Sequence, residues 1–165
     1  LLSSVRDVPG DLAEAGVYEG GSANIICDFS NGRPVHLFDT FQGFIGNQIL
    51  EGEPYKEKEL AGNYQTIKYH FDTFPNVLLY VGDVIETKEK VSDRNFKFVH
   101  LDLDIYKPTI ECLAFFWQRM SVGGIILIDD YCPTNWGIIK AVNEFIAKYN
   151  IELKRGPSRL AYLKK

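Results

Sequence analysis

The sequence predicts an α/β fold in which helices wrap a mostly parallel sheet. Short apolar runs that end in an acidic residue or a glycine recur along the chain, and segments with a helical apolar period separate them. The chain closes on two further short runs joined by turn residues. With 165 residues, of which 45% are hydrophobic, the chain is predicted to form a single domain over 1–165.

Seven of these runs are predicted strands. The first five, which we expect to pair in parallel, are Leu12–Val17, Val35–Phe38, Val77–Val81, Phe98–Leu103 and Gly124–Ile128. The last two are Ile151–Lys154 and Leu160–Leu163. The intervening segment 155–159 contains glycine, proline and serine, which favour a tight turn, so these two strands are predicted to form an antiparallel hairpin.

Four segments between the strands are predicted helices. They are Ser22–Phe29, Tyr64–Phe71, Pro108–Met120 and Trp136–Tyr149. The last two carry apolar residues three and four positions apart, which is typical of a helix that packs on a core. The polar, glutamate-rich segment 42–63 has no clean period, and a loop of this length is typical of a lid or binding loop.

Composition excludes several classes of protein. The net charge of -4 argues against a nucleic-acid partner, because proteins that bind nucleic acids gather lysine and arginine into basic patches. The longest apolar run has about five residues, so no segment is predicted to cross a membrane. The three cysteines lack the spacing of a zinc site or a disulfide framework, which favours a cytoplasmic location. The amino terminus lacks an initiator methionine and a signal peptide, so we expect it to be trimmed or cut from a longer chain.

Acidic residues gather where the predicted strands end, which is the edge at which open α/β sheets bind ligands. They are Glu14, Asp39, Asp83, Asp102, Asp104, Asp129 and Asp130. Crowded carboxylates raise one another's pKa at an energetic cost unless a cation neutralises them. The sequence therefore predicts a ligand that is an organic or metallic cation.

A glycine-rich turn follows the first predicted strand. Gly16, Gly20 and Gly21 let the backbone approach a ligand closely, and the helix that begins near Ser22 offers free N–H groups to a carboxylate or phosphate. The spacing differs from the G-x-G-x-x-G pattern of dinucleotide-binding proteins, so a pyrophosphate ligand is poorly supported. An ordinary tight turn is the alternative.

Two further acids occupy positions suited to a nucleoside. Asp39 lies 23 residues after Gly16 at the end of the second strand, where a carboxylate can accept hydrogen bonds from both ribose hydroxyls. With Thr40 it could instead form a turn or a helix cap. Asp83 follows the third strand and is placed to contact an adenine amino group, with a turn residue as the alternative.

The fourth and fifth predicted strands carry the candidate metal ligands. Asp102 and Asp104 share one face of the fourth strand with His100, which we interpret as a core histidine. Asp129 and Asp130 follow Asp102 by 27 and 28 residues and end the neighbouring strand, so three carboxylates are predicted to meet. Such all-oxygen ligands suit Mg²⁺, Mn²⁺ or Ca²⁺ better than zinc. The alternative is that some of these acids cap the helices that follow.

Four blocks of sequence carry a resemblance to a known family. They are GDLAEAGVYEGGS at 10–22, LFDTFQGF at 37–44, LDLDIY at 101–106 with Thr109, and VGGIILIDDY at 122–131. From about Gly10 to Phe145 the chain resembles the macrocin O-methyltransferases, class I S-adenosylmethionine enzymes that methylate sugar hydroxyls on natural products. The resemblance implies a Rossmann-like class I methyltransferase fold with a seven-stranded sheet and a terminal hairpin.

The resemblance also implies roles for individual residues. It places along the cofactor Glu14, Gly16, Tyr18, Gly20, Gly21, Ser22, Asp39, Thr40, Asp83 and Asp102. It makes Asp102, Asp129 and Asp130 the magnesium ligands and Asp104 or Asp102 the base beside the acceptor. Methyl transfer depends mainly on positioning, and a metal-bound hydroxyl loses its proton more easily to a nearby carboxylate.

The sequence thus predicts an S-adenosylmethionine-dependent, Mg²⁺-assisted O-methyltransferase acting on a hydroxyl of a small molecule such as a sugar. Homodimer formation rests on the resemblance alone. Only eleven residues precede Leu12, so helices that family members carry before the first motif are expected to be missing, and the segment 42–63 matches the family poorly. The rival interpretations are a nicotinamide-dependent sugar oxidoreductase and a methyltransferase-like module that binds without turnover.

Overall fold

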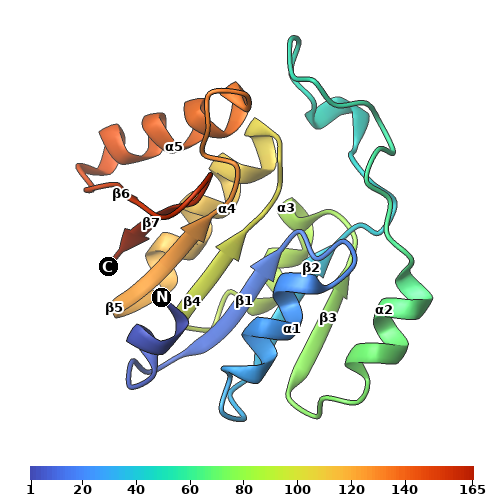
Figure 1. Ribbon diagram of the computed structural model, residues 1–165, viewed down its shortest axis with the longest axis vertical. Helices are drawn as coiled ribbons and strands as arrows, with labels where there is room; N and C mark the ends of the chain where they lie inside the picture. The colour runs from blue at the N-terminus through green and yellow to red at the C-terminus, as the bar shows by residue number, and fades with distance from the viewer.

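The computed structural model describes all residues 1–165 and contains one sheet of seven strands in the order β3-β2-β1-β4-β5-β7-β6. The strands are β1 Asp11–Ala15, β2 Val35–Asp39, β3 Val77–Val81, β4 Phe96–Leu101, β5 Met120–Ile128, β6 Lys154–Arg155 and β7 Ala161–Lys164. The first five pair in parallel, whereas β7 runs antiparallel to β5 and β6 (Figure 1). The predicted sheet and its terminal hairpin are therefore confirmed.

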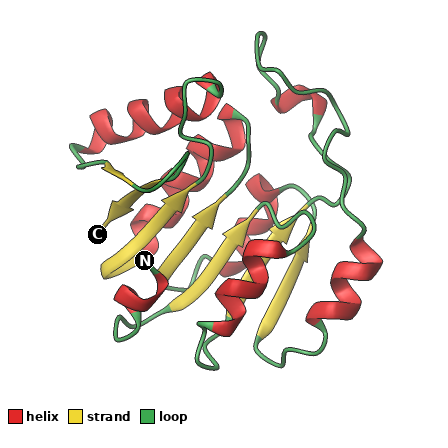
Figure 2. Ribbon diagram, in the orientation of Figure 1, coloured by secondary structure: helices red, strands yellow, loops and turns green.

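Helices cover both faces of the sheet (Figure 2). They are α1 Gly21–Asp28, α2 Tyr64–Phe71, α3 Val84–Thr87, α4 Tyr106–Arg119 and α5 Trp136–Tyr149, with 3-10 turns at Leu2–Val5, Gly46–Gln48 and Lys88–Val91. One apolar core joins the sheet to α1, α2 and the first 3-10 turn, and a second joins it to α3, α4 and α5. None of the helices combines the length and apolar character needed to cross a bilayer.

Several element boundaries differ from the prediction, each for a local reason. The short helix α3 was missed because its four residues are too few to show an apolar stripe. Helix α4 begins at Tyr106 rather than Pro108, because the carboxylate of Glu53 accepts the N–H of Tyr106 at 2.7 Å. Strand β5 begins at Met120, before a glycine pair that resembles a turn in sequence. Strand β6 covers only Lys154–Arg155.

Four of the nine non-glycine residues with a left-handed backbone lie at the carboxyl edge of the sheet. Tyr18, Phe41, Asp104 and Asp130 follow β1, β2, β4 and β5, and their φ angles are 48°, 54°, 60° and 55°. Non-glycine residues seldom adopt this left-handed conformation, and strained positions cluster at functional sites. Two of these four residues, Asp104 and Asp130, belong to the acids that were predicted to gather at this edge.

Candidate functional site

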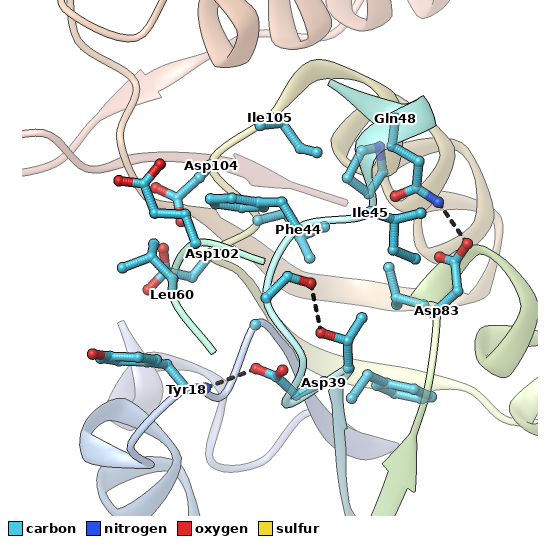
Figure 3. Close-up of a pocket in the computed structure, with 18 of the residues that line it drawn as sticks. Tyr18, Asp39, Phe44, Ile45, Gln48, Leu60, Asp83, Asp102, Asp104 and Ile105 are labelled. Carbon is cyan, nitrogen blue, oxygen red and sulfur yellow. Dashed lines mark hydrogen bonds between the residues drawn. The ribbon is translucent and has the colours of Figure 1, made fainter. Parts of the chain in front are cut away.

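A cavity of about 210 Å³ opens at the carboxyl ends of the strands, beside the point between β1 and β4 where the strand order reverses. This is the position at which open α/β sheets bind ligands. The predicted site residues that line it are Gly16, Tyr18, Asp39, Thr40, Asp83, Asp102 and Asp104. Asp102 and Asp104 lie at one end of the cavity and Asp83 at the other (Figure 3).

The floor of the cavity is formed where the turn after β1 crosses the end of β4. Gly16 has a φ of +90°, and a Cβ atom at this position would lie 1.7 Å from the backbone oxygen of Asp102. The N–H of Asp102 in turn donates to the carbonyl of Ala15 at 2.9 Å. A side chain at Gly16 would push the two strands apart, so the contact between β1 and β4 requires glycine.

Asp39 holds the glycine-rich turn in place. Its Oδ2 accepts the N–H groups of Val17 and Tyr18, each at 2.8 Å, and its Oδ1 accepts the N–H of Phe41 at 2.6 Å. Asp39 therefore does form a turn contact, which was the alternative to a ribose contact in the prediction. Asp39 also lines the cavity, so its contact with a ribose stays a prediction.

At the far end of the cavity, Asp83 joins two segments. Its Oδ1 accepts the N–H of Ile85 at 2.9 Å and caps α3. This agrees with the alternative prediction that Asp83 is a turn residue. Its Oδ2 accepts a hydrogen bond of 2.5 Å from the side-chain amide of Gln48, which belongs to the segment 42–63 (Figure 3). Asp83 therefore ties this segment, hereafter the lid, to the edge of the sheet.

The lid rises above the carboxyl edge of the sheet (teal in Figure 1), and a buried carboxylate anchors it on its other side. Glu53 is only 8% exposed; its Oε1 accepts the N–H of Tyr106 and its Oε2 the N–H of Leu50, each at 2.7 Å. The indole N–H of Trp136 donates to the carbonyl of Gly52 at 2.9 Å. The lid therefore contacts the first residues of α4 and α5. The negative charge of Glu53 is favourable there, because the amino end of a helix carries a partial positive charge.

A third lid contact reaches one of the predicted catalytic residues. The hydroxyl of Tyr55 donates to Asp104 Oδ1 at 3.1 Å, and Asn135 donates to the backbone oxygen of Asp104 at 2.9 Å. Neither Tyr55 nor Asn135 was among the predicted site residues. Asn135 immediately precedes a predicted helix and caps α5, a signal that the sequence does contain. Tyr55, like Gln48 and Glu53, lies in a polar segment without any such signal.

Several predicted cofactor residues lie outside the cavity. Glu14 is fully buried on the α1 face of the sheet, with its Oε1 at 2.7 Å from Nδ1 of His100 and its Oε2 without a partner. Burial lowers the pKa of His100, but the hydrogen bond and charge of Glu14 outweigh this and raise it. This pairing confirms His100 as a core histidine. Gly20, Gly21 and Ser22 form the start of α1 and do not line the cavity, so their contacts with a cofactor stay predictions.

Strand β4 ends at Leu101, so Asp102 and Asp104 follow the strand and do not share its face with His100, contrary to the prediction. The acids that follow β4 and β5 are near one another but are not arranged as a metal cluster. No group of three or more His, Cys, Asp or Glu side chains is close enough to hold an ion, so the predicted meeting of Asp102, Asp129 and Asp130 is not observed. Asp129 Oδ1 accepts the N–H of Asp130 at 2.7 Å. Asp130 is 8% exposed, and its buried Oδ1 has no hydrogen-bond donor.

The chemistry of these donors nevertheless fits a hard divalent cation. All are carboxylate oxygens, the ligands that Mg²⁺ and Mn²⁺ prefer, and the orphaned Oδ1 of Asp130 would gain a partner. Burial and the neighbouring carboxylates raise the pKa of Asp102 to about 7, although the charge of His100 opposes the shift. Burial likewise raises the pKa of Asp104 to about 6, although the Tyr55 hydrogen bond opposes the shift. Carboxylates that bind protons this readily are only partly compensated by nearby positive charge.

These pKa shifts predict how stability depends on pH without a divalent cation. Asp102 and Asp104 bind protons more tightly in the folded chain than in the unfolded chain, so stability should fall as the pH rises from about 4 to 7 and then level off. The expected contribution of Asp102 to the fall between pH 5 and pH 8 is about 3 kcal/mol. Denaturant unfolding at pH 5 and pH 8 measures the fall, which should be smaller in Asp102→Asn. An equal fall in both proteins would contradict the assignment.

Comparisons with known proteins agree with this geometry. The family model described as Macrocin-O-methyltransferase (TylF) matches residues 3–155. The chain is 29% identical over 170 residues to mycinamicin III 3''-O-methyltransferase of Micromonospora griseorubida, covering 89% of this chain and 63% of that protein. It is 27% identical over 164 residues to demethyldecarbamoylnovobiocin O-methyltransferase of Streptomyces niveus, covering 88% and 62% respectively.

The fold is shared with solved methyltransferase structures. The calicheamicin methyltransferase CalS11 superposes with a TM-score of 0.83 at 22% identity, covering 98% of this chain and 74% of that one. The O-methyltransferase NovP superposes with a TM-score of 0.80 at 23% identity, covering 99% and 78%. The chain spans about three fifths of the length of the curated relatives that it matches. Given the extent of the family match, the chain belongs to the macrocin O-methyltransferase (TylF) family.

Proposed function

We propose that this chain carries the catalytic centre of an S-adenosylmethionine-dependent O-methyltransferase that acts, with Mg²⁺ assistance, on a hydroxyl of a small molecule such as a sugar. The observation that carries the proposal is the cavity between the glycine-rich turn and the acids that follow β4, in a chain of this family. Two curated relatives are named for methylating the 3''-hydroxyl of mycinamicin III and the 4'-hydroxyl of a rhamnosyl tetracenomycin.

The geometry suits methyl transfer from a sulfonium. The acids Asp102 and Asp104 place negative charge at one end of the cavity, where a positively charged methyl donor is stabilised. Asp39 fixes the turn over which the cofactor would lie, and residues of the lid line the same cavity. The transfer needs the acceptor oxygen in line at about 3 Å, so rigid positioning is the main contribution of the protein.

The acceptor hydroxyl must lose its proton, and a carboxylate at the Asp102–Asp104 end of the cavity can accept it. Asp104 suits this role because Tyr55 and Asn135 fix its side chain and its backbone. Asp102, Asp129 and Asp130 are the residues that would hold Mg²⁺, which would lower the pKa of a bound acceptor hydroxyl.

Calorimetric titration with S-adenosylmethionine and S-adenosylhomocysteine, each with and without Mg²⁺, tests the cofactor half of the proposal. We expect saturable binding of both compounds without the metal, because the cavity lies beside the acids of β5 rather than among them. Saturable NADH binding without competition from S-adenosylmethionine would instead favour the oxidoreductase. Methyl transfer to any hydroxylated acceptor would exclude a module without turnover.

Two substitutions are expected to separate the cofactor residues from the metal residues. Asp39→Ala should weaken S-adenosylhomocysteine binding by about 1 to 3 kcal/mol, because the backbone N–H groups that shape the turn lose their acceptor. Asp129→Asn should leave that affinity unchanged and weaken Mn²⁺ binding, because Asp129 lies outside the cavity. Calorimetry and electron paramagnetic resonance measure the two affinities. A collapse of cofactor affinity in Asp129→Asn would refute the separation.

A further inference from the structure

An arginine lies against the buried acid at the end of β5. Asp130 Oδ1 has no hydrogen-bond donor, yet Nη1 of Arg159 lies 3.1 Å from it. The pair is therefore close enough for charge attraction but is not aligned as a hydrogen bond. The Arg159 side chain is 59% exposed, whereas that of Asp130 is 12% exposed. The largely exposed guanidinium of Arg159 thus neutralises the charge of the buried Asp130 carboxylate.

Backbone hydrogen bonds hold the turn that carries Arg159. The carbonyl of Arg159 accepts the N–H of Tyr131 at 2.9 Å. At the other end of the same turn, Arg155 Nη1 donates to the carbonyl of Tyr131 at 2.8 Å, and its guanidinium lies 4.7 Å from the centre of the Tyr131 ring. The turn 155–159 is thus held on the segment that carries Asp129 and Asp130. The Arg159 side chain is held only by its contact with Asp130 and is otherwise largely exposed.

We propose that Arg159 is a built-in counter-cation, which occupies the cation position on Asp130 and is displaced when a divalent metal ion binds there. This inference rests on the metal half of the proposed function. Two cations cannot share one carboxylate oxygen without strong repulsion. A small divalent ion attracts that oxygen more strongly than a guanidinium whose charge is spread over three nitrogens, and the exposed arginine regains side-chain freedom on release.

The proposal has a consequence for affinity. Metal binding includes breaking the Arg159–Asp130 contact, so the chain binds the metal less tightly than its carboxylates alone would. Removing the arginine should therefore strengthen metal binding by more than the general effect of removing one positive charge. Arg155 provides the comparison, because it carries the same charge on the same turn but contacts Tyr131 instead of a carboxylate.

The test is a Mn²⁺ titration of the full chain, in which the electron paramagnetic resonance signal of the free ion is measured. We expect Arg159→Gln to lower the dissociation constant three- to tenfold relative to the unsubstituted chain, and Arg155→Gln to change it less than twofold. Arg159→Lys keeps the charge on a shorter, more strongly hydrated group and should give an intermediate value. S-adenosylhomocysteine affinity, measured by calorimetry, should be the same in all four proteins and verifies that each is folded.

Three results would overturn the inference. Equal effects of Arg159→Gln and Arg155→Gln would show only a long-range influence of net charge. Weaker Mn²⁺ binding in Arg159→Gln would show that the arginine orients Asp130 for the metal instead of competing with it. Absence of Mn²⁺ binding from every variant would remove the metal site itself. Retained S-adenosylhomocysteine binding in that last case would leave the cofactor half of the proposed function intact.

Discussion

Replacing Gly16 with alanine is expected to lower the free energy of unfolding by more than about 3 kcal/mol and to abolish detectable S-adenosylhomocysteine binding. The added Cβ would lie 1.7 Å from the backbone oxygen of Asp102, and the residue would keep an unfavourable φ of +90°. Relief requires the turn after β1 to move away from the end of β4, which deforms the floor of the cavity. Denaturant unfolding and calorimetry measure the two effects.

Gly21 provides the matched control for this experiment. It lies five residues further on, as the first residue of α1, and a Cβ at this position would meet nothing within 4 Å. Gly21→Ala should leave stability unchanged or raise it by up to about 1 kcal/mol, because alanine favours the helix. If Gly16→Ala behaved like Gly21→Ala, the contact between β1 and β4 would not be as close as the structure shows.

Releasing the lid is expected to have the second largest effect. Glu53→Ala removes the acceptor for the N–H groups of Tyr106 and Leu50. Gly137→Ala acts on the same contact from the other side, because its Cβ would lie 2.1 Å from Oε1 of Glu53. Both variants should speed tryptic cleavage after Lys56 and Lys58 at least tenfold and weaken S-adenosylhomocysteine binding.

The two lid variants are informative because their local effects on α5 differ. Alanine at Gly137 favours the helix by about 1 kcal/mol, so a loosened lid in that variant cannot be attributed to a weakened helix. Glu51→Ala is the control for charge, because Glu51 is exposed in the same segment and its side chain makes no hydrogen bond in the structure. Unchanged cleavage in Gly137→Ala would contradict the role of Glu53 as the anchor.

The sequence alone determined the sheet and the position of the site. Strand periodicity located all five parallel strands, and the rule that ligands bind at the carboxyl ends of such strands then placed Asp39, Asp83, Asp102 and Asp104 at one edge. These predictions succeeded because they depend on local properties: apolar pattern, turn composition and the residue that ends each strand. The glycine-rich turn was recognised for the same reason. Only glycine fits at position 16, because a Cβ atom there would clash with the backbone of Asp102 at the end of β4.

Only the tertiary structure decided how these residues are paired. No sequence pattern indicates that Glu53 anchors the lid on the start of α4, 53 residues away, or that Glu14 lies beside His100, 86 residues away. Arg159 reaches Asp130 because the terminal hairpin folds back on β5. Polar contacts between distant segments have no period in the sequence. They depend on which side chains the packed core brings within hydrogen-bond distance, and that is a property of the whole fold.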